Sequence, residues 1–209
     1  MSHLILQGDN TNWPGFSLLG ESSLAITFDE TGSGFGAFNQ LPFLVLSGTT
    51  SVSIASTGGN LPTTSNGLLQ PEEMTNNLTT VTISGSKHFF LGISTDHANS
   101  GDGVVTDIAA SATSPTTIHS SLKLIDASAT TGQLEIYAGA TNTSGGGLFE
   151  NGGSLNPNIT ITYTGLKIKG GSGNDLIEND AKNGIVTGWQ RHRSCPGRPT
   201  LRLRHSLRS

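Results

Sequence analysis

Residues 170–178, Gly-Gly-Ser-Gly-Asn-Asp-Leu-Ile-Glu, form the one pattern in this chain whose residue types and spacing specify chemistry. They match the nonapeptide G-G-x-G-x-D-x-U-x, in which U is a large aliphatic residue, here Ile177. The glycines permit a tight turn whose backbone carbonyls and Asp175 carboxylate face a hard cation, and Ile177 then points from a short strand into a core. Oxygen ligands of this kind predict a Ca²⁺ site.

The same nine-residue frame continues over residues 179–187, where Val186 takes the aliphatic position. Its turn contains residue types that tolerate left-handed backbone or offer oxygen ligands, although the glycine pair is missing: Asn179, Asp180, Asn183 and Gly184. Asp180 is therefore a further candidate ligand. Because an ion in a solenoid lies between stacked turns, a full site needs a third unit near Gly188, and no such unit follows.

A second stretch with calcium-type ligands covers residues 96–103, with Asp107 close behind it. Its carboxylates lie on glycine turns, but their spacing does not fit the helix-loop-helix calcium motif and no helical pattern flanks them. We interpret the stretch as an acidic turn and keep Asp96 and Asp102 as candidate metal ligands.

Catalytic motifs are mostly absent, since the sequence has no G-x-S-x-G elbow, no H-E-x-x-H and no histidine cluster. The alternative to a structural role is a calcium-assisted hydrolase of a small ester or lactone. In such a reaction Ca²⁺ polarises the carbonyl, Asp102 or Asp175 orients water, and His97 or His119 relays the proton. His97, Asp102 and His119 are thus the candidate catalytic residues, and the sequence leaves open whether the chain is an enzyme.

The composition predicts that short strands hold these motifs. Glycine accounts for 28 of 209 residues, charged residues for 12% and aromatic residues for 6%, which favours β-branched strands with polar turns over helices. Alternating runs predict strands at 24–28, 43–46, 51–54 and 159–163. The best candidate for a short helix is residues 71–74, Pro-Glu-Glu-Met, because proline and acidic residues favour a first helical turn.

An imperfect long repeat sets the expected architecture. Residues 78–84 align with residues 122–128, 44 positions later, and each run is followed by an aliphatic pair, at 91–93 and at 134–136. A further pair of strands, 159–163 and 166–168, leads into the nonapeptide. Short strands with polar turns of variable length predict an all-β, irregular parallel β-helix (a solenoid), with a two-sheet β-sandwich as the alternative.

Three regions follow from these patterns. Residues 1–42 form an N-terminal β region of uncertain fold, residues 43–188 form the solenoid, and residues 189–209 form a basic tail. No apolar run is long enough for a transmembrane span, and the first residues lack the features of a signal peptide. The only cysteine, Cys195, lies in the tail, so residues 1–188 contain none, which is compatible with an exported protein without disulfides.

The tail differs sharply in composition from the rest of the chain. It holds all six arginines, whereas residues 1–188 carry five lysines against fifteen acidic residues, a net charge of −10. A basic tail could bind nucleic acid, but this one has no aromatic residue beyond Trp189 and no helical periodicity, so we predict no nucleic-acid partner. We expect an out-of-frame, disordered segment, which makes the chain a fragment of a longer protein.

The nonapeptide resembles the calcium-binding repeat of RTX proteins, which Gram-negative bacteria secrete through type I systems. Together with the runs at 78–84 and 122–139, it is similar to bacterial surface-layer proteins and large RTX adhesins, over about residues 43–188. The resemblance implies a Ca²⁺-stabilised scaffold outside the cell or on its surface. It also implies that Asp175 is the side-chain ligand, with Gly170, Ser172 and Asn174 near the carbonyls that complete the turn.

Two further expectations accompany this resemblance. The interrupted array implies self-association at the end of the solenoid near Gly188, where another molecule would supply missing ligands. A second resemblance, to metagenome-derived calcium-dependent acyl-homoserine lactonases, is carried by no motif and implies the ester or lactone substrate of the hydrolase alternative.

Overall fold

The computed structural model describes residues 1–8, 15–30, 38–58, 65–73, 77–92, 116–138, 159–179, 183–188 and 190–191. All regular elements in these ranges are β-strands. The first sheet consists, in spatial order, of β1 (Ser2–Gln7), β3 (Ser23–Glu30), β5 (Ser51–Gly58), β7 (Thr80–Gly85), β10 (Leu124–Thr130), β13 (Lys167–Lys169) and β15 (Ile185–Thr187). The second consists of β2 (Gly15–Leu19), β4 (Phe38–Ser47), β6 (Ser65–Glu73), β8 (Phe89–Leu91), β11 (Leu134–Ala138), β14 (Asp175–Asn179) and β16 (Gln190–Arg191).

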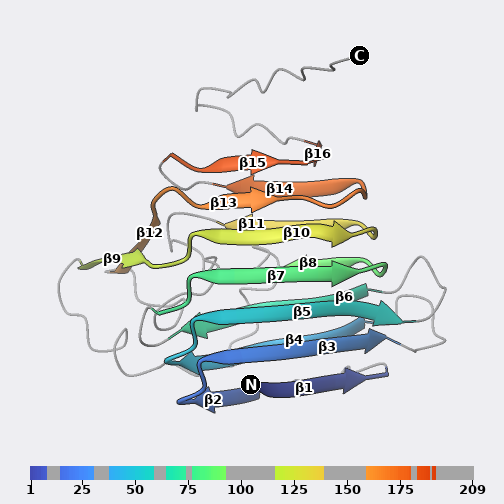
Figure 1. Ribbon diagram of the computed structural model, residues 1–209, viewed down its shortest axis with the longest axis horizontal. Helices are drawn as coiled ribbons and strands as arrows, with labels where there is room; N and C mark the ends of the chain where they lie inside the picture. Colours follow the sequence, from blue (N-terminus) through green and yellow to red (C-terminus); the bar gives the residue numbers. More distant parts are fainter. Residues whose placement is uncertain are drawn as a thin grey trace.

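The chain alternates between these two sheets, so that neighbours within a sheet are separated by a strand of the other sheet (Figure 1). A small third sheet pairs β9 (Thr116–Ser120) with β12 (Ile159–Tyr163). All pairings between these strands are parallel, as in β3 with β5 and β11 with β14. The expected all-β class and parallel pairing are confirmed, whereas the alternative, a β-sandwich, pairs its strands antiparallel.

Apolar side chains from both sheets form one core between them. Burial alternates along β5, where Val52 and Ile54 are buried, because successive side chains point to opposite faces of a strand. Phe28 of β3 and Phe89 of β8 meet across the two sheets with their ring centroids 5.3 Å apart in an edge-to-face arrangement. Both rings are fully buried, which stabilises the fold by about 2–3 kcal/mol each through the apolar surface removed from water.

The predicted 44-residue repeat corresponds to neighbouring strands of the first sheet. Val81 of β7 pairs with Ile125 of β10, which is the expected alignment. The aliphatic pairs that follow were predicted two positions out of register, because Leu134 pairs with Phe89 and Ile136 with Leu91. Phe89 and Leu91 are the inward-facing, buried residues of β8, and burial of these side chains fixes the register.

The prediction of a short helix at residues 71–74 was wrong for the part the structure describes, because residues 71–73 belong to β6 and pair with residues 44–46 of β4. Pairing along β4 outweighs the local preference of proline and acidic residues for a first helical turn. Pro71 lacks an N–H group and cannot donate a hydrogen bond to a neighbouring strand. β8 pairs only with residues 66–68 of β6, so no pairing with β8 is lost at Pro71.

The first residues of the chain share the sheets of the later ones. β1, β2 and β3 extend the two seven-stranded sheets, and the expected boundary after residue 42 falls within β4. In the described ranges no helix is long and apolar enough to cross a membrane. Apart from residues 190–191, the tail lies outside the described residues.

Candidate functional site

The first five residues of the nonapeptide, 170–174, form the turn between β13 and β14, and this turn lies directly on the turn between β10 and β11. A Cβ atom on Gly171 would lie 2.2 Å from the carbonyl oxygen of Thr130, and a Cβ on Gly173 would lie 2.2 Å from that of Gly132. The N–H of Ser172 donates a 2.9 Å hydrogen bond to the same Thr130 oxygen. The glycines are therefore required by the close approach of one backbone turn to another.

The nine-residue frame continues on the other side of this turn. Ile168 pairs with Val186, eighteen residues later, while Ile177 lies between them in the second sheet. The N–H of Gly170 donates a 2.7 Å hydrogen bond to the carbonyl of Thr187. The predicted continuation through Val186 is thus confirmed, with each nine-residue step carrying the chain to the opposite sheet.

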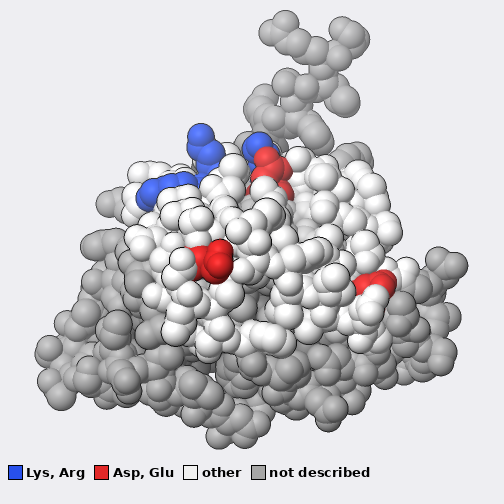
Figure 2. Space-filling model, turned by 60° about the horizontal axis from the view of Figure 1, so that its bottom comes forward, with Lys and Arg blue, Asp and Glu red and all other residues white. Residues whose placement is uncertain are grey.

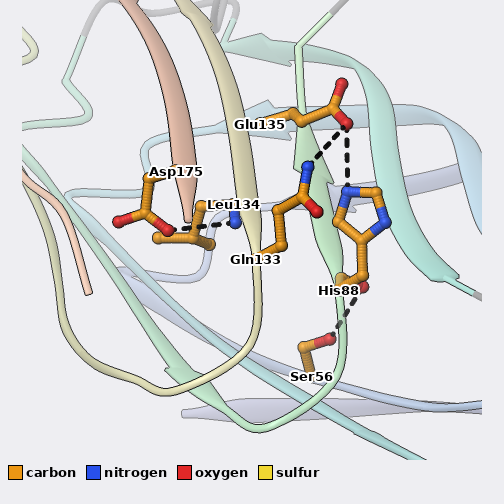
Figure 3. A network of polar contacts seen from close by, with 6 residues as sticks. All are labelled: Ser56, His88, Gln133, Leu134, Glu135 and Asp175. Carbon is orange, nitrogen blue, oxygen red and sulfur yellow. Dashed lines mark hydrogen bonds and ion pairs between the residues drawn. The ribbon is translucent and has the colours of Figure 1, made fainter. Parts of the chain in front are cut away.

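Asp175 is fully buried at the start of β14, and both of its carboxylate oxygens accept hydrogen bonds from the backbone. The N–H of Gly171 donates to Oδ2 at 2.9 Å. The N–H of Leu134 donates to Oδ1 at 3.2 Å, as Figure 3 shows. Burial raises the pKa of Asp175 above its usual value of 3.8, and the two N–H bonds oppose that rise. Among the described residues no lysine or arginine forms an ion pair with this carboxylate.

Asp175 occupies a register position that is buried on five successive strands of the second sheet: Asn39, Asn66, Phe89, Leu134 and Asp175. The amides of the two asparagines donate hydrogen bonds to preceding backbone carbonyls, at 2.8 Å from Asn39 to Leu6 and 2.9 Å from Asn66 to Thr57. The carboxylate of Asp175 accepts bonds instead. In its ionised form this acceptor places a buried negative charge beside the nonapeptide turn.

The remaining predicted ligands fall into two groups. Gly170 is buried under Gly188, whereas the side chains of Ser172 and Asn174 are exposed on the turn. Asp96, His97, Asp102 and Asp180 lie outside the described residues. His119 lies in β9 opposite Thr162 of β12, in the small sheet rather than the sheet that carries Asp175.

The oxygen atoms at the turn are of the type that binds a calcium ion. Ca²⁺ takes six to eight oxygen ligands, and an ionised carboxylate has about four acceptor positions, of which two are used here by N–H groups. Within the described ranges no three Asp, Glu, His or Cys side chains are grouped as metal ligands. Backbone carbonyls of the turn and water would have to complete the coordination of a bound ion. Such a ligand set is typical of a weak site.

A histidine–carboxylate pair close to this turn was not predicted. Nε2 of His88 lies 3.2 Å from Oε1 of Glu135, without hydrogen-bond geometry, and Nε2 of Gln133 lies 3.5 Å from the same oxygen (Figure 3). Glu135 and Asp175 lie on opposite faces of the second sheet, since Glu135 follows the inward-facing Leu134. His88 and Glu135 are 47 positions apart in the sequence, so only the strand register brings them together.

A second ion pair lies on the outer face of the first sheet. Nζ of Lys169 lies 2.6 Å from Oδ2 of Asp126, and these residues are register partners on β13 and β10. The hydrogen bond from Lys169, followed by that from Ser128, lowers the pKa of Asp126 to about 2. Few other charged side chains interrupt the described surface in Figure 2.

No known protein-family model matches the chain, and no curated protein or solved structure matches it at a significant level.

Proposed function

We propose that the chain is a calcium-binding scaffold of the β-solenoid type, in which Ca²⁺ binds at the turn formed by residues 170–175. The solenoid is supported by the alternation of the chain between two parallel sheets, by the nine-residue steps from Ile168 to Ile177 to Val186, and by the close stacking of turns at Gly171 and Gly173. Each coil then consists of one strand from each sheet and the turns between them.

The buried carboxylate of Asp175 is the single observation that carries the calcium site. Its raised pKa means that burial disfavours the ionised form, and no cationic side chain of the described residues offsets this. A divalent cation beside the turn would stabilise the charge and would use the free lone pairs of the carboxylate. The carbonyls of Gly170, Ser172 and Asn174 are the nearest further donors in sequence.

Calcium-dependent thermal unfolding tests this proposal. The wild type is expected to unfold at a higher temperature in millimolar Ca²⁺ than after chelation, because an ion that binds only the folded state stabilises it. Asp175→Asn should abolish this difference at some cost in stability, because its amide can accept a bond from only one of the N–H groups of Gly171 and Leu134. Circular dichroism shows whether the variant keeps its β structure. An unchanged melting temperature of the wild type over this calcium range contradicts the proposal.

Asp126→Asn is the matched control. It removes one carboxylate from the same part of the fold, but from the outer face of the first sheet, where it pairs with Lys169 and has no hydrogen bond to the nonapeptide turn among the described contacts. The control should retain the full calcium-dependent increase. If both variants lose it equally, the effect comes from overall charge and not from a site at Asp175.

A location outside the cell or on its surface forms part of the same proposal. Sites with few carboxylates have dissociation constants of about 10⁻⁴ to 10⁻³ M, the range of extracellular calcium modules. The hydrolase alternative depends on His97, Asp102 and His119, of which the first two lie outside the described residues. No contact in the described ranges favours it, so we propose the scaffold alone.

A further inference from the structure

The N-terminal end of the two sheets exposes an unusual amount of apolar surface. β1 ends the first sheet and β2 ends the second, at the same end of the molecule (Figure 1). Four of the five large apolar side chains that are exposed in the described residues belong to this end: Met1, Ile5, Phe16 and Leu19. The fifth, Ile185, lies on β15 at the opposite end.

The core itself is open at this end. Phe16 of β2 pairs with Leu44 of β4, yet Phe16 is 41% exposed and Leu44 only 1%. On the same strand, Leu18 is only partly buried although its register partner Leu46 is fully buried. The rows of core side chains therefore end at this layer in side chains that are only partly buried.

The two edge strands also lack the usual protection against pairing with another chain. Natural edges are blunted by charged side chains or proline, because their free N–H and C=O groups accept a further strand. The sequences of β1, Ser-His-Leu-Ile-Leu-Gln, and β2, Gly-Phe-Ser-Leu-Leu, contain no Lys, Arg, Asp, Glu or Pro. Figure 2, in which this end is turned forward, shows few charged groups on the described surface.

From this end of the molecule we infer that the chain forms a two-fold symmetric dimer, in which β1 and β2 of one copy meet the same strands of a second copy. β1 then pairs antiparallel with its counterpart, and the open layer around Phe16 and Leu18 is covered. A second copy fits because β1 and β2 carry no acidic or basic side chain apart from His3, and the ammonium group of Met1 beside β1 is paired with Glu21 at 3.6 Å, so like-charge repulsion between two copies is small. A two-fold contact also closes, whereas stacking on the other end would give an open filament.

The opposite end is a poor partner for this edge. Its last strand, β16, ends at Arg191, and five more arginines follow in residues 192–209. The proposed contact is distinct from the end-on contact near Gly188 that the sequence predicted, which stays a prediction.

Sedimentation or light scattering of the full chain tests the dimer. The wild type should have about twice the monomer mass of 21.7 kDa, in Ca²⁺ and in EDTA alike, because the contact does not include the nonapeptide turn. Ile5→Lys should raise the dimer dissociation constant by at least about a hundredfold, since it places two like charges near the symmetry axis. Leu19→Lys, on the other sheet, should act in the same direction.

Ile185→Lys is the matched control, because Ile5 and Ile185 are exposed isoleucines on the two end strands of the same sheet, 55% and 45% exposed. It should leave the dimer unchanged, and circular dichroism should show that each variant keeps its β structure. A monomeric wild type contradicts the inference even if no variant folds. Dissociation by Ile185→Lys but by neither Ile5→Lys nor Leu19→Lys also contradicts it.

Discussion

The N–H group of Leu134 donates a hydrogen bond to Oδ1 of Asp175, 41 residues further along the chain, at 3.2 Å. These residues are register neighbours on β11 and β14, so the carboxylate joins the nonapeptide turn to the preceding strand. Asp175 thus has a structural role even without an ion. A bound cation would add to this role, because it would neutralise the buried charge.

The raised pKa of Asp175 predicts a specific pH dependence in calcium-free buffer. A buried acid whose folded-state pKa exceeds the unfolded value of 3.8 adds stability that is fully present below 3.8 and lost as the pH rises through the folded-state pKa. The stability of wild type relative to Asp175→Asn should therefore fall as the pH rises. Urea unfolding at a series of pH values measures this difference, and a relative stability that rises with pH contradicts the assignment.

Calcium should reverse this trend. Because only the ionised carboxylate binds the ion, the calcium-dependent gain in melting temperature should grow as the pH rises through the pKa of Asp175. Thermal unfolding with and without Ca²⁺ across the same pH series measures the gain. A gain that is independent of pH places the ion at another group.

Gly171→Ala should destabilise the fold by about 2 kcal/mol or more, because its Cβ would lie 2.2 Å from the carbonyl oxygen of Thr130 and the stacked turns would have to separate. Ser172→Ala, at an exposed position of the same turn, should change the free energy of unfolding by less than about 0.5 kcal/mol. Chemical denaturation measures both values. Equal effects of the two substitutions argue against turn stacking as the reason for the glycine.

The ion pair between Asp126 and Lys169 should contribute little stability, because about half of the Lys169 side chain is exposed to solvent. Lys169→Ala is expected to cost no more than about 1 kcal/mol at neutral pH. The pKa of Asp126 should rise from about 2 toward 3.8 in this variant, since the hydrogen bond from Lys169 contributes most to its lowering. The wild-type contribution is present above pH 3.8 and is lost as the pH falls toward 2. NMR titration of Asp126 tests this directly, and an unchanged pKa contradicts it.

Phe89→Ala should cost about 3–5 kcal/mol, because the ring is fully buried and packs edge-to-face on Phe28 across the two sheets. Phe16→Ala removes the same side chain from the exposed end layer and should cost clearly less in the monomer. The comparison is made by urea denaturation of both variants in the Ile5→Lys background, in which the inferred dimer is dissociated. A larger cost at Phe16 than at Phe89 means that the core does not lie between the sheets as described.

Local patterns in the sequence were sufficient for the strand type and for the nine-residue frame. Alternation marked 78–84 and 122–128 as neighbouring strands, and Val186 was placed correctly because the nonapeptide fixes the spacing of its aliphatic residues. The glycines at 171 and 173 were assigned to a tight turn, and the structure adds that the turn below leaves no room for a side chain. Alternation, repeat spacing and glycine turns involve residues that are close in the sequence, so they can be recognised in a single sequence.

Features that depend on long-range register were not predictable. The two-residue error at β8 arose because aliphatic residues at 91–93 fitted the pattern, while burial selected Phe89 and Leu91. Asn39 and Asp175, the ends of the column that also contains Asn66, are 136 positions apart, and the connections between its members differ in length, so no fixed spacing reveals it. The contact of His88 with Glu135 depends on the same register.

Calorimetric titration of the full chain with Ca²⁺ tests the central claim most directly. We predict that the wild type binds with a dissociation constant of about 10⁻⁴ to 10⁻³ M and that Asp126→Asn binds equally well. Asp175→Asn should show no binding in this range while keeping its β structure. Binding by Asp175→Asn with the affinity of the wild type, or no binding by the folded wild type, would contradict a calcium site at the nonapeptide turn.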